Sequence, residues 1–279
     1  MMQTYTIRSM TRRDLDLAVA WAAEEGWNPG AHDAQAFYET DPDGFFIGER
    51  DGEPIASISA VAYGAEFGFI GFYIVKPAYR GQGYGIALWN HAMTYLQGRN
   101  IGLDGVIAQQ DNYKKSGFRL AYSNIRFENR FAGEPSPGLV DLRTVPFDPI
   151  LAYDTRHFPV PRERFLRAWL HMPNTKGYAK WDGTQLRGYG IIRSCGTGYK
   201  IGPLFAEDAQ IADVLYRALC LESNGEPVYL DVPEVNSAAM ALAESYDMRN
   251  VFGTARMYTQ DAPAMEIQSI FGVTTFELG

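Results

Sequence analysis

Three glycines at alternating positions are the feature of this sequence that most directly predicts chemistry. They follow the apolar, β-branched run 67–75 and precede 86–96, where apolar residues recur at helical spacing. A strand that enters a helix through glycines leaves the first helical N–H groups free and uncrowded, and these groups attract anions. The sequence therefore predicts a site for a ligand that carries a diphosphate. The residues of the loop are Arg80, Gly81, Gln82, Gly83, Tyr84 and Gly85.

Other phosphate-binding loops do not match this pattern. A P-loop ends in Gly-Lys-Ser/Thr, and no lysine follows these glycines. A dinucleotide fingerprint reads G-x-G-x-x-G, whereas Gly81, Gly83 and Gly85 are spaced G-x-G-x-G. The partners of a kinase glycine loop are also missing from the chain.

The stretch resembles the cofactor loop of the GNAT superfamily of N-acetyltransferases, in which Gln/Arg-x-x-Gly-x-Gly/Ala follows a strand ending in Val-x-Pro. Here the strand ends Val75-Lys76-Pro77, and the loop begins at Arg80. The resemblance implies acetyl-CoA as acyl donor and a central strand that separates from its neighbour at 72–75, where the pantetheine arm pairs with exposed amides. The residues expected to bind acetyl-CoA are Tyr73, Ile74, Val75, Arg80, Gly81, Gln82, Gly83, Tyr84, Gly85 and Asn112.

Tyr113 is the main catalytic candidate. It opens a Tyr-x-x-x-Gly-Phe pattern that closes at Gly117-Phe118, and in GNAT enzymes with this pattern the tyrosine protonates the leaving thiolate. The proton transfer is reasonable, since a phenol has a pKa near 10 and a thiol about 8.5. A tyrosine that only packs its helix against the sheet is the alternative.

The general base is less well defined. The position at which the family often carries a glutamate falls at Phe69, which cannot accept a proton. Glu66, three residues earlier, and Glu25, before the break 26–30, are the candidate bases. Trp27 and Asn28 in that break are candidates for the acceptor site. Solvated surface roles remain open for all four.

Composition limits the class of protein. The chain has 279 residues, which suits two domains, and a net charge of −8, which argues against sequence-independent nucleic-acid binding. Two cysteines, no export signal and no long apolar stretch indicate a cytoplasmic protein without membrane spans. The four histidines have no metal-ligand spacing, so we expect no metal.

A linker rich in proline and glycine at 133–138 predicts two domains, a catalytic one at 1–132 and a second at 139–279. A weak repeat relates the two: each has an Asp-Gly turn, two strands, a proline, a loop and a helix. The expected fold is α+β, with two tandem GNAT-like domains, each a twisted, mostly antiparallel sheet flanked by helices. The tail 271–278 is expected to be a strand that pairs with a sheet.

The second domain is expected to be degenerate. Where the first has its glycine loop, the second has Leu204-Phe205-Ala206-Glu207-Asp208, which places two carboxylates where phosphates would bind. Its counterpart of Tyr113 is Ala243. It would narrow the acceptor pocket or form a homodimer surface.

The sequence thus predicts an acetyl-CoA-dependent N-acetyltransferase that acts on a primary amine of a small molecule by direct attack, without an acyl-enzyme. Two alternatives remain open. One is an acyl-CoA-binding protein or sensor without catalysis, which the absence of a glutamate at Phe69 favours. The other is an acetyltransferase of protein N-termini or lysines, which would need a long open groove.

Overall fold

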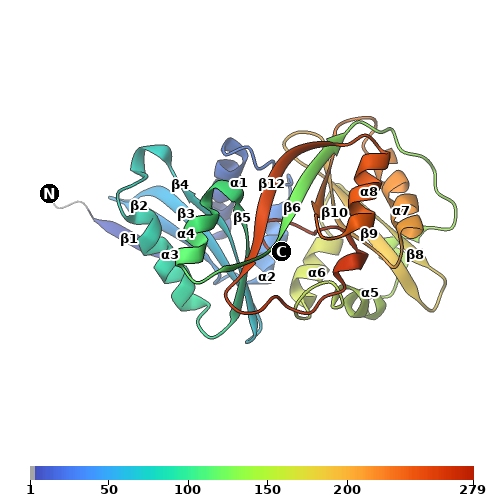
Figure 1. The fold of residues 1–279 in the computed structure, drawn as a ribbon. Coiled ribbons are helices and arrows are strands. Elements are labelled where there is room, and N and C mark those ends of the chain that lie inside the picture. Colours follow the sequence, from blue (N-terminus) through green and yellow to red (C-terminus); the bar gives the residue numbers. More distant parts are fainter. Residues whose placement is uncertain (1–3) are drawn as a thin grey trace.

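The computed structural model describes residues 4–279, and the chain forms two similar halves (Figure 1). Local signals account for several boundaries: a capping box of Thr11 and Asp14 begins α1, and the turn at Asp51-Gly52 joins β2 to β3. The elements of the first half are β1 (Tyr5–Ser9), α1 (Arg12–Glu24), α2 (Asp33–Thr40), β2 (Phe45–Arg50), β3 (Glu53–Tyr63), β4 (Phe67–Val75), α3 (Tyr84–Tyr95), β5 (Asn100–Val106), α4 (Gln110–Lys115) and β6 (Arg119–Asn129).

The second half repeats the same order and then adds one short strand. Its elements are β7 (Val140–Asp141), α5 (Phe147–Asp154), α6 (Glu163–Leu170), β8 (Thr175–Trp181), β9 (Leu186–Ser194), β10 (Tyr199–Ala206), α7 (Ala209–Leu221), β11 (Val228–Pro233), α8 (Ser237–Ser245), β12 (Arg249–Tyr258) and β13 (Ile270–Gly272). In both halves a helix connects two parallel strands, α3 between β4 and β5 and α7 between β10 and β11. The weak repeat in the sequence is therefore a structural repeat.

The two halves exchange their last strands. The sheet runs β1-β2-β3-β4-β5-β12-β6-β11-β10-β9-β8-β7, so β12 of the second half lies beside β5 of the first, and β6 of the first lies beside β11 of the second. Figure 1 shows β6 and β12 crossing between the halves as an antiparallel pair. The order reads the same from either end, which is the order of a two-fold arrangement within one chain.

The linker at 133–138 consequently separates the repeats along the chain without separating the sheet. The expected mixed α/β fold with two similar halves is confirmed, and the two halves share one sheet. The domain limits 1–132 and 139–279 stay a prediction, because β12 and β6 each belong to one half by sequence and to the other by pairing.

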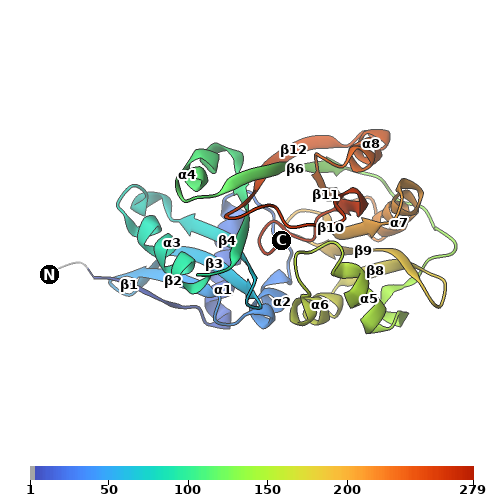
Figure 2. The same ribbon diagram turned by 60° about the horizontal axis from the view of Figure 1, so that its bottom comes forward.

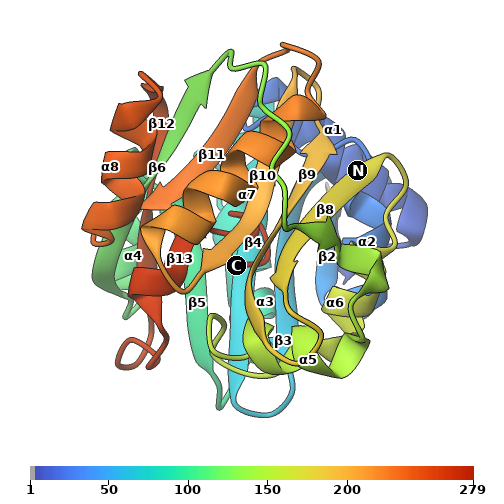
Figure 3. The same cartoon turned by 90° about the vertical axis from the view of Figure 1, so that its right-hand side faces the viewer.

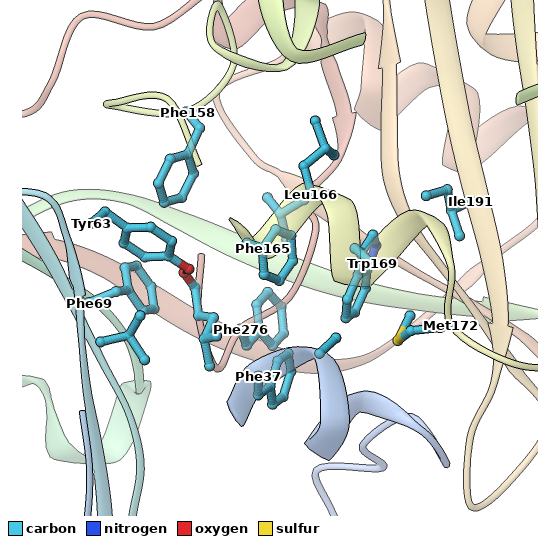
Figure 4. Packing of buried hydrophobic residues seen from close by; sticks show 14 of the residues in the cluster. Phe37, Tyr63, Phe69, Phe158, Phe165, Leu166, Trp169, Met172, Ile191 and Phe276 are labelled. Atoms are coloured by element: carbon cyan, nitrogen blue, oxygen red, sulfur yellow. The ribbon is translucent and has the colours of Figure 1, made fainter. Parts of the chain in front are cut away.

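A shared apolar core joins the halves on one side of the sheet. In the close-up, Phe37 of α2 and Trp169 of α6 stack with ring centroids 6.0 Å apart and planes 8° apart, while Phe276 of the tail lies beside them (Figure 4). Figure 2 shows α2 and α6 facing each other, with the end of the tail between the two halves. Helices α7 and α8 cover the sheet of the second half on its other side (Figure 3).

Two expectations for the second half were wrong. The stretch 139–145 is a strand for only two residues, and α5 follows it. The tail is a strand only over Ile270–Gly272; the remainder is irregular but buried. In the described residues no helix is long and apolar enough to cross a membrane. The same residues hold no group of three or more His, Cys, Asp or Glu side chains placed to bind a metal.

Candidate active site

A cavity of about 910 Å³ lies where β4 and β5 separate. The two strands pair only from Phe67 to Ile70, although β4 continues to Val75 and β5 to Val106. Beyond this paired segment, residues of β4 form one side of the cavity and residues of β5 form the opposite side. The glycine loop, α3, α4 and the segment 25–27 form further walls, and β12 and the tail contribute residues from the second half.

A bulge in β4 produces the separation. The register between β3 and β4 shifts between Ser57 and Ser59, and Phe72 has a φ of 47°, which is unusual for a bulky side chain. From Gly71 to Val75 the side of β4 that faces β5 has no partner strand among the described residues. These backbone groups are available to a ligand that runs along the strand. Tyr73, Ile74 and Val75 all line this edge, as the sequence predicted.

The glycine loop opens the N-terminus of α3 toward the cavity. Gly83 is the N-cap, with a φ of 88° and no side-chain cap, and Gly81 has a φ of 72°. Both are open positions where an added Cβ would meet nothing within 4 Å. Gly85 has a different role, because a Cβ there would lie 2.8 Å from the Tyr73 hydroxyl; it lets α3 approach β4. The free N–H groups at this helix end suit an anion.

Arg80 and Glu25 form an ion pair at the edge of the cavity. The Arg80 guanidinium also donates to the carbonyl of Val75 over 2.7 Å, which fixes the loop to the end of β4. Half of the Arg80 side chain is exposed, so one face of its charge remains available. Glu25, one of the two predicted bases, lines the cavity but is already neutralised by this arginine.

Tyr113 of α4 reaches the same cavity. Gly105 of β5 makes this possible, since a Cβ at that position would lie 2.3 Å from the tyrosine ring. The ring packs near Trp89, with centroids 5.7 Å apart. Burial raises the pKa of Tyr113 to about 12, with a smaller contribution from Tyr73, so the hydroxyl keeps its proton. In the described residues nothing in the protein accepts a hydrogen bond from it, which leaves the proton available.

The other predicted cofactor residues divide into two groups. Asn112 lines the cavity and donates to Gln109 over 2.7 Å. Gln82 and Tyr84 do not line it: Gln82 donates to the Ala78 carbonyl over 2.9 Å, and the Tyr84 ring packs against Tyr5 at 4.8 Å. These two side chains therefore support the loop.

The structure does not bring the second predicted base, Glu66, to the cavity. It is exposed in the turn before β4, at the end of the strand opposite to the bulge. Phe69, where the family often has its glutamate, is fully buried. Trp27 does line the cavity. Asn28 does not, because its side chain binds the backbone of Thr197 through bonds of 3.0 and 2.9 Å and so ties the first half to the second.

Several residues of the site were missed from the sequence. Phe252 and Thr254 come from β12, and Phe276 and Glu277 come from the tail. The apolar character of the tail was the only signal that it packs inside the molecule. Asp104 also lines the cavity, but Arg256 pairs with it at 2.6 and 2.8 Å. It is therefore a structural carboxylate.

The corresponding cleft of the second half is filled by the chain itself. Strands β10 and β11 pair only from Tyr199 to Ile201 and then separate. The short strand β13 enters between them: it pairs with β10, and the N–H of Val273 donates to the Asp231 carbonyl of β11 over 2.8 Å. Asp208 caps α7 by accepting from the N–H of Ile211 over 2.8 Å. Neither the cleft nor the helix end is free for a ligand.

Comparison with known proteins agrees with this arrangement. Residues 10–118 match the model of the "Acetyltransferase (GNAT) family", and 150–272 match that of the "Acetyltransferase (GNAT) domain". A holothin acyltransferase of Pseudoalteromonas sp. (strain SANK 73390) is 31% identical over 99% of this chain and 95% of its own.

Two solved structures share the fold over nearly the whole chain. The putative acetyltransferase of Pyrococcus horikoshii has a TM-score of 0.85 at 21% identity and covers 99% of this chain and 96% of its own. A tandem GNAT protein from the clavulanic acid biosynthesis pathway has a TM-score of 0.64 at 12% identity and covers 93% of this chain and 100% of its own.

Proposed function

The chain belongs to the GNAT family of acyltransferases, in tandem form with a degenerate second half, and from this premise we propose that it transfers acetyl from acetyl-CoA to a primary amine of a small molecule. The observation that carries the proposal is the combination of an open β4–β5 cleft, an uncapped α3 and a protonated tyrosine around one cavity. The similar protein from Pseudoalteromonas is named a holothin acyltransferase, which supports acyl transfer.

The residues present fit acetyl-CoA. The diphosphate would lie at the N–H groups that follow Gly83, with Arg80 beside it, and each charge-assisted bond would contribute about 1.5–3 kcal/mol. The thioester supplies an activated acyl group. The free edge of β4 from Gly71 to Val75 would hold the pantetheine arm and polarise the thioester carbonyl through a backbone N–H. Tyr113 would give its proton to the departing thiolate.

A small acceptor fits the cavity better than a protein chain. An acetyltransferase of protein termini needs a groove that continues across the surface, whereas β12 and the tail form a wall of this cavity. The alternative of a non-catalytic acyl-CoA sensor differs from an enzyme only in turnover. In a sensor the hydroxyl proton of Tyr113 would have no functional role.

The experiment is calorimetric titration of acetyl-CoA into the wild type, Gly83→Trp and Gly183→Trp. Gly183 is a matched control, because its φ is 99°, an added Cβ meets nothing within 4 Å, and it lies in the turn between β8 and β9. We expect one equivalent to bind to the wild type and to Gly183→Trp, and none to Gly83→Trp. Equal binding to all three proteins would show that the loop is not the cofactor site.

Turnover then separates the enzyme from the sensor. Release of free thiol from acetyl-CoA is followed with a panel of small primary amines. Release that depends on an amine supports acetyl transfer. Tight binding without release for any amine would favour the sensor, and release with peptides alone would favour a protein acceptor.

A further inference from the structure

The tail after β13 connects the filled cleft of the second half with the open cleft of the first. It first passes Gly202, where an added Cβ would lie 2.4 Å from the carbonyl oxygen of Thr274. It then reaches Gly71 beside the bulge of β4, where an added Cβ would lie 2.1 Å from the carbonyl oxygen of Glu277. The backbone of Glu277 thus lies against the strand position at which the cavity begins.

The tail is held firmly on both sides of Glu277. The hydroxyl oxygen of Thr275 accepts from the N–H groups of Glu277 and Leu278 over 3.2 and 2.9 Å. Tyr63 donates to the Leu278 carbonyl over 2.9 Å, and Arg162 donates to Thr274 over 2.8 Å. Such fixation is what a group needs in order to act on a ligand at a defined position.

The carboxylate of Glu277 lines the cavity. The residue is 3% exposed, and within residues 4–279 no hydrogen bond or ion pair reaches its side chain. The other deeply buried carboxylates behave differently, since Asp33, Asp154 and Asp231 each pair with an arginine at 2.9, 2.8 and 2.6 Å. A buried carboxylate without a partner is costly and is a feature of functional sites.

Burial and the surrounding charges have opposite effects on the pKa of Glu277. Burial raises its pKa, and Asp33 of α2 acts in the same direction. Lys200 of β10, Arg126 of β6 and Arg193 of β9 oppose this shift. The net effect is a pKa above the 4.5 of an ordinary glutamate, which brings the carboxylate closer to the range in which a general base is efficient.

Three of the aromatic side chains that line the cavity come from outside β4, the segment 76–85, α3 and α4. They are Trp27 from the break after α1, Phe252 from β12 and Phe276 from the tail, and the rings of the last two lie 6.4 Å apart. Asp104, the other buried carboxylate of the lining, is paired with Arg256. Aromatic walls with one buried carboxylate free of an arginine suit a ligand that is flat and apolar and carries one basic nitrogen.

Building on the proposed function, we propose that Glu277 is the proton acceptor of the reaction and that Trp27, Phe252 and Phe276 select an aromatic primary amine. The lone pair of the amine nitrogen forms the C–N bond, and one of its protons passes to Glu277. The C–S bond breaks, and the thiolate takes the proton of Tyr113. Passage of the proton from Glu277 to Tyr113 through water then restores both groups.

The test compares Glu277→Gln and Glu277→Asp with Glu66→Gln, which makes the same chemical change outside the cavity. Acetyl-CoA is the donor, and 2-phenylethylamine and n-propylamine are the acceptor probes. Acetyl-CoA affinity, amine affinity, thermal unfolding and the pH profile of kcat/KM are measured for each protein. We expect the wild type to prefer 2-phenylethylamine at least tenfold. Its kcat/KM should fall on the acidic side for two reasons, protonation of the free amine and protonation of Glu277 at a pH above 4.5.

In Glu277→Gln we expect unchanged acetyl-CoA affinity, weaker binding of 2-phenylethylamine and at least about 100-fold slower turnover. The part of the acidic limb that comes from Glu277 should disappear, while the part that comes from protonation of the free amine should remain. The thermal stability of Glu277→Gln should not fall. The unfolded chain gives up this proton at a lower pH than the folded one, so the ionised group destabilises the fold at neutral pH. Glu277→Asp should restore part of the rate and the limb, and Glu66→Gln should match the wild type.

Different failures have different meanings. Turnover of Glu277→Gln within threefold of the wild type, or an acidic limb identical to that of the wild type, would overturn the role of Glu277. A wild type that binds acetyl-CoA but neither binds nor acetylates 2-phenylethylamine would overturn the aromatic acceptor. A wild type that binds no acetyl-CoA would instead remove the proposed function on which this inference rests.

Discussion

The two halves of this chain have corresponding clefts, of which one is open and the other is filled. In each half, a helix connects two parallel strands that pair at one end and separate at the other, β4 from β5 and β10 from β11. In the second half β13 occupies the separation and binds both strands. In the first half no chain segment of the described residues does so. Backbone N–H and C=O groups need hydrogen-bond partners. In the filled cleft β13 supplies these partners, whereas in the open cleft a ligand or water must supply them.

The helix ends show the same difference. Helix α7 receives a side-chain cap from Asp208, whereas α3 begins at Gly83 without one. The Asp208 cap occupies one of the free N–H groups of α7 and places a negative charge at that helix end, whereas the uncapped end of α3 remains an anion site. In a repeated fold, a half that does not bind the ligand can thus be recognised because its own chain segments and side chains occupy the positions where the ligand would bind.

The largest effect is expected from emptying the filled cleft. Deletion of residues 270–279 removes five buried apolar side chains that contribute on the order of 10 kcal/mol in total, comparable to the stability of a whole domain. We expect the shortened chain not to fold, as measured by circular dichroism and solubility. The side chains are Ile270, Phe271, Val273, Phe276 and Leu278. A shortened chain that folded and bound two equivalents of acetyl-CoA would show that β13 alone makes the halves different.

The second largest effect is expected from removing the Tyr113 hydroxyl of the first half. Tyr113→Phe removes the proton donor, and kcat should fall about 100-fold or more with unchanged acetyl-CoA affinity. Because the pKa of Tyr113 is raised to about 12, its ionisation should cause no loss of wild-type rate from about pH 8 to 10. Tyr246→Phe in the second half is the control, since its hydroxyl bonds Asp213 away from the cavity. Equal rates for all three proteins would make Tyr113 a packing residue.

A matched pair of smaller changes tests where the tail matters for function. Gly71→Ala and Gly202→Ala each place a methyl group against the tail, and overpacking of this kind should destabilise each protein by about 1–3 kcal/mol in urea unfolding. Only Gly71→Ala moves the tail beside the cavity, so only this variant should lose turnover beyond its loss of stability. Equal losses of turnover would mean that the two contacts are functionally equivalent.

The smallest effect is expected from removing the cap of the second half. Asp208→Ala should lower the free energy of unfolding by about 1 kcal/mol, the usual contribution of an N-cap. Acetyl-CoA should still bind with one equivalent, because β13 continues to fill the cleft. A second equivalent, detected by calorimetry, would show that the Asp208 carboxylate rather than β13 excludes the ligand.

The sequence predicted the parts of the site that lie close together along the chain. The glycine loop, the separating strand and Tyr113 all fall between 71 and 113, and their spacing reflects one strand–loop–helix unit. The tandem repeat was also visible, because its turns and helices follow local rules.

The remaining parts depend on contacts between distant residues. The pattern of β12 is the same whether it pairs with β11 or with β5, so its exchange leaves no local trace. Phe276 and Glu277 reach the cavity only because the tail crosses between the halves. The expectation for Glu66 failed for a similar reason, since a strand pattern does not say which end of the strand opens onto the cavity.

The strand exchange determines when the cavity can exist during synthesis. Gly102 of β5 pairs with Tyr258 of β12, and no earlier part of the described chain occupies that edge. Until residue 258 has left the ribosome, the first half exposes an unpaired strand edge, which invites wrong pairing. The chain must therefore be made as far as residue 258 before the first half can close. Ribosome-bound intermediates of this protein should need protection by chaperones for longer than those of a chain with two independent domains.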